Sequence, residues 1–307
     1  MSETHGFEAT AISLSELLAS VVEKAGGSVV QVSARRGVGS SGVVWSADGV
    51  VVAADHNVER EDDVTLGLPD GSTVPARLVG RDPSTDVAVL RAEASGLAVP
   101  EWSDLGGLKV GHLVLGVLRP GRSVRATFGI VSAVGEEWRT PAGGKLDRYL
   151  QTDLDILKGF SGGLIADVRG RALGLGTAGL LRGQAMVIPA ETLKRVVEAL
   201  LEHGRIPRGQ LGVGLVPLRL PAALEEATGQ PTGLMVVMVQ PGSSAEAAGV
   251  LLGDILISLD GHSVSDLSHL HSLLSQERVG AASELRLVRA GELRTVAVTI
   301  QAREPTR

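Results

Sequence analysis

The stretch KGFSGG, residues 158–163, places Ser161 between glycines and directly behind Phe160. A serine hydroxyl becomes a nucleophile when a histidine takes its proton, a carboxylate holds that histidine, and backbone N–H groups bind the oxyanion. Glycine and serine are also the usual residues of tight loops, because glycine adopts positive φ without strain. Ser161 is therefore either a nucleophile or the tip of a loop, and this stretch alone leaves both open.

Two other residues have the types and positions that such a serine needs. His56 ends the apolar run GVVVAADH, and Asp86 opens the apolar run DVAVL after the turn-like RDPST. A charged residue at the start of a buried strand is costly without a partner, so we expect Asp86 to have one, and a histidine is a natural candidate. The alternatives are a structural histidine and an aspartate that only caps the turn.

The composition limits the classes of function. The chain has 307 residues, enough for two domains or three small ones, and 44% of them are hydrophobic. Its net charge is −6 and its arginines are scattered, so we do not expect nucleic acid as a partner. The absence of cysteine excludes thiol chemistry and thiolate zinc sites. We expect neither a metal nor a cofactor.

The amino-terminal segment, residues 1–28, contains a short amphipathic helix over 13–24 that Gly26 and Gly27 end. Its apolar residues recur at helical spacing: Leu14, Leu17, Leu18, Val21 and Val22. The segment lacks the basic region of a secretory signal, and no apolar run reaches the roughly 20 residues that span a bilayer. We therefore expect a cytoplasmic protein as written, or a protein of the periplasm or cell envelope if the sequence is a mature form.

Residues 29–203 are predicted to form one β-rich domain. Short valine-rich runs alternate with glycine turns up to about Ile188, which favours antiparallel hairpins and either two packed barrels or a sandwich. A helix follows Pro189 and ends at Gly204. A short linker over 204–208 leads to a second unit.

The second unit covers residues 209–303 and has the size of a small independent domain. Its sequence predicts strands together with two helical pieces, near 222–228 and 267–276. The chain is therefore expected to be mostly β, with one large domain followed by one small one.

Several motifs together resemble the HtrA (DegP-like) serine proteases. They occur in the order and at about the separations of that family: GSSGVVWSADGVVVAADHNV, DPSTDVAVL, FGIVSAVG, YLQTDLDILKGFSGGLIAD and AMVIPAETLKRVVEALLEHGRIPRGQLGV. The resemblance covers residues 11 to 303 and implies a chymotrypsin/trypsin-like double β-barrel followed by a small α+β PDZ domain. It also implies an ATP-independent serine endopeptidase that cleaves unfolded or exposed polypeptides in protein quality control.

The resemblance assigns roles to individual positions. His56 matches the general base, Asp86 the carboxylate that orients it, and Ser161 the nucleophile. The backbone N–H groups of Gly159 and Ser161 match the oxyanion hole. The motif order thus favours the nucleophile over the loop tip at Ser161.

Asp155 lies six residues before the nucleophile, at the offset that forms the base of the primary specificity pocket in the trypsin-like superfamily. A buried carboxylate without a partner is costly, so Asp155 would favour a basic residue before the cut. The alternative is that Lys158 or solvent satisfies Asp155 and the pocket takes a small aliphatic residue.

The chain departs from the family pattern near the nucleophile and the base. Phe160 stands where asparagine is usual, and Lys158 stands where proline is usual. Asp55 precedes the histidine in place of an asparagine, and Asn57 follows it in place of a valine. These departures leave open a catalytically silent relative, a peptide-binding or chaperone-like protein whose oxyanion loop Phe160 and Lys158 hold closed.

The carboxy-terminal unit resembles a PDZ domain of the same family. The stretch GQLGVGL matches the loop and strand that receive a peptide's terminal carboxylate through the N–H groups of four residues: Gln210, Leu211, Gly212 and Val213. Leu211, Val213 and Leu215 alternate along one side, which suits the addition of an extended peptide as a strand. We expect unfolded or misfolded polypeptides and peptide carboxyl termini as partners. The family also suggests a homotrimer, for which Phe7 is the one aromatic residue of the amino-terminal segment.

Overall fold

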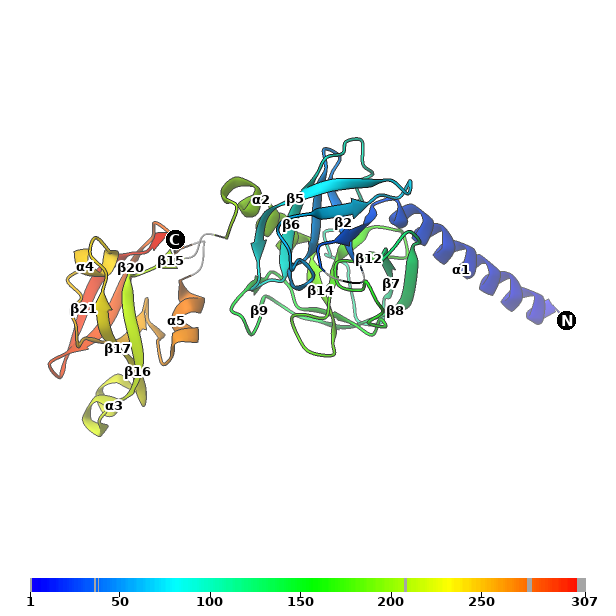
Figure 1. Cartoon of the computed structure of the whole chain (residues 1–307). Coiled ribbons are helices and arrows are strands. Elements are labelled where there is room, and N and C mark those ends of the chain that lie inside the picture. The colour runs from blue at the N-terminus through cyan, green and yellow to red at the C-terminus, as the bar shows by residue number, and fades with distance from the viewer. Residues whose placement is uncertain (1, 36, 38, 207–208, 275–277, 303–307) are drawn as a thin grey trace. The chain divides into compact units, whose positions relative to one another are not determined.

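The chain forms two compact units, Met1–Ile206 and Pro207–Arg307 (Figure 1). The computed structural model describes these residues: 2–35, 37, 39–206, 209–274 and 278–302. The division falls within the predicted linker 204–208, of which 207–208 lie outside the described residues. Across the described part of the chain, none of the helices is both long and apolar enough to cross a membrane.

The first unit contains a closed six-stranded barrel with the strand order β1-β2-β3-β6-β5-β4. The strands are β1 Val29–Ser33, β2 Ser40–Ser46, β3 Val50–Ala54, β4 Val64–Gly67, β5 Thr73–Asp82 and β6 Val87–Ala92. All neighbouring pairs are antiparallel, as the short glycine turns predict. Valine, alanine and leucine side chains fill the interior, because β-branched and small residues fit the pleated inner surface.

A second closed barrel follows in the same unit, with the order β11-β14-β13-β12-β7-β8. Its strands are β7 Leu113–Leu118, β8 Arg125–Val134, β11 Leu150–Thr152, β12 Leu164–Asp167, β13 Ala172–Thr177 and β14 Ala185–Pro189. A small hairpin of β9 Trp138–Arg139 and β10 Lys145–Leu146 lies between β8 and β11 in sequence. The prediction of a double β-barrel is confirmed, and the sandwich alternative is wrong.

Two helices flank the barrels. α2 Ala190–His203 begins after Pro189 and packs against β5, β6, β13 and β14. Gly204 ends it with a φ of +70° and donates its N–H to the carbonyl of Leu200, as the predicted cap requires.

α1 Ser2–Gly26 starts earlier than the predicted helix over 13–24. Residues 2–12 contain no proline, so nothing in them prevents the helix from continuing. The carboxy-terminal end of α1 packs on the barrels, where Val21 is buried, whereas Leu14 and Leu17 nearer its middle are exposed. The apolar stripe of α1 therefore continues beyond the surface that covers it.

The second unit is a small α+β domain. Its main sheet has the order β16-β17-β18-β20-β21, with β19 paired to β18, and β15 pairs separately with β22. The elements are β15 Gly209–Gln210, β16 Val213–Arg219, α3 Ala222–Thr228, β17 Thr232–Val239, α4 Ser244–Ala247, β18 Ile255–Leu259, β19 His262–Ser263, α5 Leu267–Leu273, β20 Ala282–Arg289, β21 Glu292–Thr299 and β22 Gln301–Ala302. Both predicted helical pieces are present. α5 ends before the predicted residue 276, and residues 275–277 and 303 lie outside the described residues.

Candidate active site

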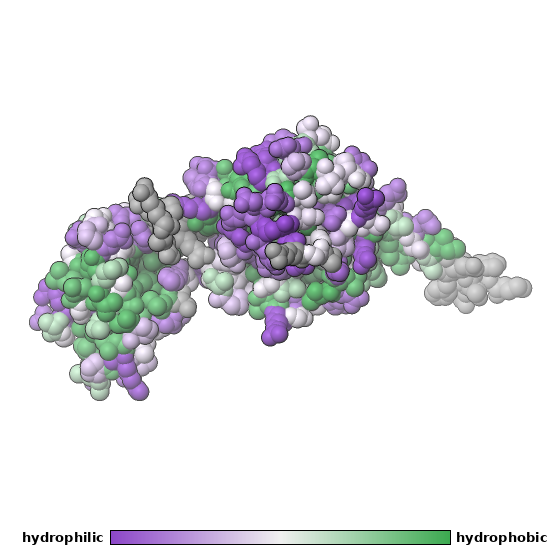
Figure 2. All heavy atoms as spheres, in the orientation of Figure 1, coloured by the Kyte–Doolittle hydropathy of each residue, from purple (hydrophilic) through white to green (hydrophobic). Residues whose placement is uncertain are grey.

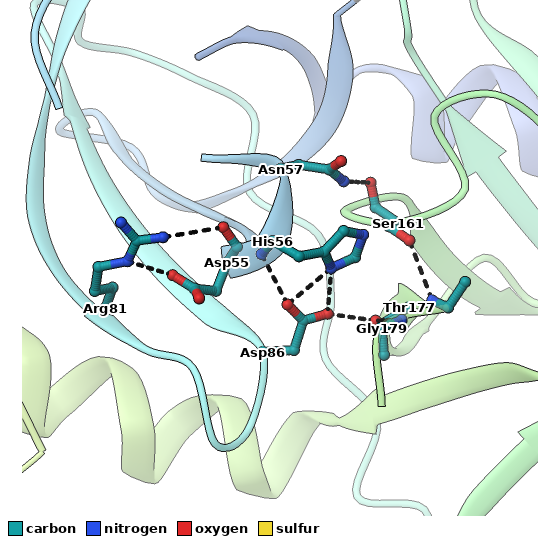
Figure 3. A network of polar contacts seen from close by, with 9 residues as sticks. Asp55, His56, Asn57, Arg81, Asp86, Ser161, Thr177 and Gly179 are labelled. Carbon is teal, nitrogen blue, oxygen red and sulfur yellow. Dashed lines mark hydrogen bonds and ion pairs between the residues drawn. The ribbon is translucent and has the colours of Figure 1, made fainter. Parts of the chain in front are cut away.

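His56 and Asp86 come from neighbouring strands of the first barrel. His56 lies in a single 3-10 turn, η1 Asp55–Asn57, directly after β3. Asp86 lies directly before β6, and the last residue of β3 pairs with the first residue of β6. Ser161 belongs to the loop between β11 and β12 of the second barrel. The three residues thus meet at the junction of the two barrels (Figure 3).

The carboxylate of Asp86 holds the imidazole of His56. Nδ1 of His56 lies 2.9 Å from both carboxylate oxygens, and the backbone N–H of His56 donates to Oδ1 at 3.0 Å. A neutral imidazole that donates from Nδ1 leaves Nε2 as a proton acceptor. The hydrogen bond to Asp86 raises the pKa of His56 above its ordinary 6.5, against the opposing effect of burial.

Asp86 is only 5% exposed, so its charge needs partners within the protein. Besides His56, Thr177 donates its hydroxyl to Oδ2 of Asp86. The turn before Asp86 is capped by Asp82, which accepts hydrogen bonds from the hydroxyls of Ser84 and Thr85 at 2.6 Å. The prediction that Asp86 has a histidine partner is therefore confirmed, and the alternative that it only caps the turn is wrong.

Ser161 lies beside the ring of His56 (Figure 3). Its Oγ accepts a hydrogen bond from the N–H of Ala178 at 3.1 Å. In the described part of the chain, no hydrogen bond joins Ser161 Oγ to His56. Such bonds are often long before substrate binds, so the arrangement is compatible with a nucleophile and its base.

The loop around Ser161 can be built only with glycine at two positions. Gly159 has a φ of +87° and Gly162 a φ of +90°, a region that other residues rarely adopt. A Cβ at Gly162 would lie 2.0 Å from the carbonyl oxygen of Ser41 in β2. A Cβ at Gly159 would lie 2.9 Å from Cβ of Pro120. The loop is therefore packed closely against residues of both barrels.

Phe160 fixes the same loop from the inside of the second barrel. Its side chain is 1% exposed and belongs to the apolar core of that barrel, and its N–H donates to the carbonyl of Leu157 at 2.9 Å. Lys158, in contrast, is exposed. The phenylalanine side chain is thus an anchor in the core and does not cover Ser161.

A second ion pair supports the turn that carries His56. Arg81 donates from Nε to Asp55 Oδ1 at 2.6 Å and also reaches the carbonyl of Val58 at 3.0 Å. Burial raises the pKa of Asp55, although the hydrogen bond from Arg81 opposes this effect. The pair ties both ends of η1 to β5.

Two residues of the site were missed by the sequence reasoning. Thr177 donates its hydroxyl to Asp86, as described above. Gly179 lies so close to His56 and Asp86 that a Cβ at this position would be 2.6 Å from Nδ1 of His56. Thr177 is the last residue of β13 and Gly179 follows shortly after it, both in the run GLGTAG. The glycines of this run were the available signal, but they do not indicate which residues the turn approaches.

Asp155 is exposed. The argument from a buried carboxylate without a partner is therefore wrong. Its backbone N–H donates a long hydrogen bond to Oγ1 of Thr127 at 3.3 Å. Whether Asp155 selects the residue before the cut stays a prediction.

The residues predicted to bind a peptide terminus lie together in the second unit. Gln210, Leu211, Gly212, Val213 and Leu215 line a cavity of about 250 Å³, whose other wall includes Leu267, Leu270, His271 and Leu274 of and after α5. The carbonyl of Leu211 accepts a hydrogen bond from the N–H of Ala245 at 3.0 Å, and the carbonyl of Gly212 accepts one from the N–H of Gln240 at 2.8 Å. Both carbonyls of the loop are thus used in hydrogen bonds within the domain, and a ligand carboxylate would have to be bound by backbone N–H groups instead.

Two family models match the chain. A trypsin-like peptidase domain matches residues 40–175, and a PDZ domain matches residues 209–300. The first match contains His56, Asp86 and Ser161, and the second contains the cavity between β16 and α5.

Curated relatives and solved structures match over both domains. The chain is 33% identical to a probable periplasmic serine endoprotease DegP-like of Halomonas elongata over 87% of this chain and 56% of the relative. It is 30% identical to the periplasmic serine endoprotease DegP of Salmonella typhimurium over 86% and 57%, so it spans little more than half the length of these relatives. An HtrA-type protease AlgW variant solved with a decapeptide has a TM-score of 0.73 at 25% identity, covering 94% of this chain and 98% of that one. A serine endoprotease of Yersinia pestis has a TM-score of 0.69 at 26% identity, covering 92% and 97%.

The matches to the relatives and to the solved structures cover 86% or more of this chain and so extend over both of its units. The fold, the two family matches and the geometry around Ser161 all indicate a trypsin-like peptidase domain followed by a PDZ domain. The chain contains a trypsin-like peptidase domain followed by a PDZ domain, and over both units it is similar to DegP-like and HtrA-type serine proteases.

Proposed function

We propose that the chain is a serine endopeptidase that acts without ATP on unfolded or exposed polypeptides in protein quality control. The observation that carries the proposal is the buried Asp86 holding Nδ1 of His56 next to Ser161. The names of the relatives as periplasmic serine endoproteases support it. They also support a compartment in the cell envelope for this chain.

In the proposed reaction, Ser161 Oγ attacks the carbonyl carbon of the scissile peptide bond while His56 Nε2 takes its proton. Asp86 keeps the imidazole in the tautomer that accepts at Nε2 and stabilises the imidazolium that forms. The N–H groups of Gly159 and Ser161 bind the oxyanion, each contributing about 10²–10³ in rate. His56 then protonates the leaving amine, and water enters to hydrolyse the acyl group on Ser161.

The PDZ domain is proposed to capture the carboxyl termini of substrate chains. The cavity is lined by the apolar side chains of Leu211, Val213 and Leu215 and also by polar groups, which suits a peptide terminus with an apolar side chain and a carboxylate. The silent-relative alternative has less support, because Phe160 lies in the core of the second barrel.

A fluorophosphonate probe is expected to label Ser161, because His56 and Asp86 raise the nucleophilicity of that hydroxyl. Mass spectrometry of the labelled peptide identifies the site. The Ser161→Ala variant should take up no probe, and Asp86→Asn should react about 10⁴-fold more slowly because the imidazole tautomer is lost. Labelling that persists in Ser161→Ala refutes the assignment.

The acidic limit of activity is expected to follow the protonation of His56. The base must be neutral, so kcat/KM should fall as the pH drops through a pKa above 6.5. The Asp86 hydrogen bond is the largest cause of the raised pKa, so Asp86→Asn should lower it. An NMR titration of His56 in Ser161→Ala, with and without Asp86→Asn, measures the shift, and equal pKa values in both proteins contradict it.

Peptides with free, apolar carboxyl termini are expected to bind the PDZ domain more tightly than their amidated forms. Amidation removes the charge that the N–H groups of the loop Gln210–Val213 would recognise. Isothermal titration of the Ser161→Ala protein with a matched acid and amide pair measures the difference. Equal affinities would show that the loop does not bind the carboxylate.

We also propose that the protein forms a homotrimer through its amino-terminal helix. The described part of α1 carries apolar side chains that the barrels leave uncovered, among them Ile12, Leu14 and Leu17 (Figure 2). An apolar cavity of about 700 Å³ lies where α1 meets β7 and β8, and Phe128 on its rim is 49% exposed. Packing between copies would bury these surfaces.

Sedimentation equilibrium is expected to give three times the mass of the chain. The double substitution Leu14→Glu and Leu17→Glu places charges on the uncovered face and should give a folded monomer. A wild-type monomer at micromolar concentration overturns the trimer without affecting the proposed reaction.

A further inference from the structure

The two residues expected to provide the oxyanion N–H groups have their carbonyls held by side chains of the first barrel. Ser41 donates its hydroxyl to the carbonyl of Gly159 at 2.7 Å. Asn57 donates from Nδ2 to the carbonyl of Ser161 at 3.2 Å (Figure 3). Both donors come from elements of the first barrel, β2 and η1, whereas the loop belongs to the second barrel.

The hydroxyl of Ser41 both accepts and donates a hydrogen bond. It accepts the backbone N–H of Arg119 at 2.8 Å, so its own proton is directed to Gly159. Ser41 is fully buried, and its backbone carbonyl touches the position of Gly162 at the other end of the loop. No water competes for the bond at such a site, so the hydroxyl makes a well-defined contact.

Arg119 itself is held in place by its side chain. Its guanidinium donates to the carbonyls of Val29, Gly26 and Arg122 at 2.6 to 2.9 Å. The N–H that positions the Ser41 hydroxyl therefore comes from a residue tied to the end of α1 and the start of β1.

Asn57 is 4% exposed and follows His56 in the same turn. That turn thus presents the base and also holds the backbone of the nucleophile. The family usually has valine at this position, and a valine side chain has no N–H to donate. The contact to Ser161 therefore depends on the side-chain amide of Asn57.

The loop needs such restraint because its own sequence supplies little. A glycine at position 159 does not itself restrict either backbone dihedral angle. Lys158 before it lacks the fixed φ that a proline would provide. A hydrogen bond to the carbonyl of a residue fixes the peptide plane that follows it, which limits the rotation of the residue and so narrows the range of directions open to its own N–H. Phe160 anchors the middle of the loop, and the two side-chain donors anchor the residues on either side of it.

We propose that Ser41 and Asn57 are positioning residues that hold the oxyanion N–H groups of Gly159 and Ser161 in the reactive direction. This inference rests on the proposed function. Neither residue touches the substrate, so each acts through the loop. Removing either donor lets one N–H turn away from the oxyanion, which weakens binding of the tetrahedral state and leaves binding of the substrate unchanged.

The test compares Ser41→Ala and Asn57→Leu with wild type in kcat, KM and affinity for a peptidyl boronate, which forms a tetrahedral adduct on Ser161. Each variant should lose about 10- to 100-fold in kcat, because small misplacements of catalytic groups cost this much. The affinity for the boronate should fall in parallel. KM should stay at the wild-type value, and so should the pKa that governs the fall of kcat/KM at low pH. The control is Ser40→Ala, the preceding buried serine on β2, whose hydroxyl contacts Val32 at 3.5 Å, and it should retain full activity.

Three outcomes contradict the inference. Wild-type kcat and boronate affinity in both variants would show that the loop does not need the two donors. Equal losses in substrate binding, boronate binding and thermal midpoint would show a purely structural role. A wild-type protein that neither cleaves peptides nor reacts with the fluorophosphonate overturns the proposed function, and the inference fails with it.

Discussion

The close passage of the Ser161 loop against the first barrel is the constraint on which the site depends. The backbone carbonyl of Ser41 leaves no room for a side chain at Gly162, and the side-chain hydroxyl of Ser41 donates a hydrogen bond to the carbonyl of Gly159. This contact joins a loop of the second barrel to a strand of the first. Because His56 belongs to the first barrel, the same contact sets the distance between His56 and Ser161, the proposed base and nucleophile. The two barrels are thus two halves of one site, and neither can bring these groups together alone.

The buried carboxylates at this junction have hydrogen-bond and ion-pair partners close by. Asp86 is almost inaccessible to water, but it accepts hydrogen bonds from the ring and backbone of His56 and from the hydroxyl of Thr177. Asp55, next to His56, is paired with Arg81. A buried carboxylate is tolerated when its oxygens are satisfied, and one that keeps its charge raises the pKa of a neighbouring imidazole. The polar network therefore stabilises the fold at this point and prepares the base.

Much of this arrangement could be predicted from the sequence. The alternation of apolar runs and glycine turns shows a histidine and an aspartate at strand ends, and the order of the motifs predicts Ser161 as the nucleophile. Thr177, Ser41 and the donor role of Asn57 were not predictable, because each contact joins positions that the barrel topology alone brings together. Of the two interpretations of Asp155, the buried carboxylate is wrong and contact with solvent is found, because an offset from Ser161 does not determine solvent exposure. The early start of α1 was missed because helix propensity without an apolar stripe is a weak signal.

The central claim is that Ser161 is the nucleophile of an endopeptidase whose oxyanion loop is held ready by the first barrel. Digestion of casein by the purified full-length protein and by Ser161→Ala, run side by side, tests it most directly. The account predicts that the wild type degrades casein without ATP and that Ser161→Ala leaves it intact. Intact casein with the wild type, even after addition of a peptide with a free apolar carboxyl terminus, or degradation that persists in Ser161→Ala, would contradict it.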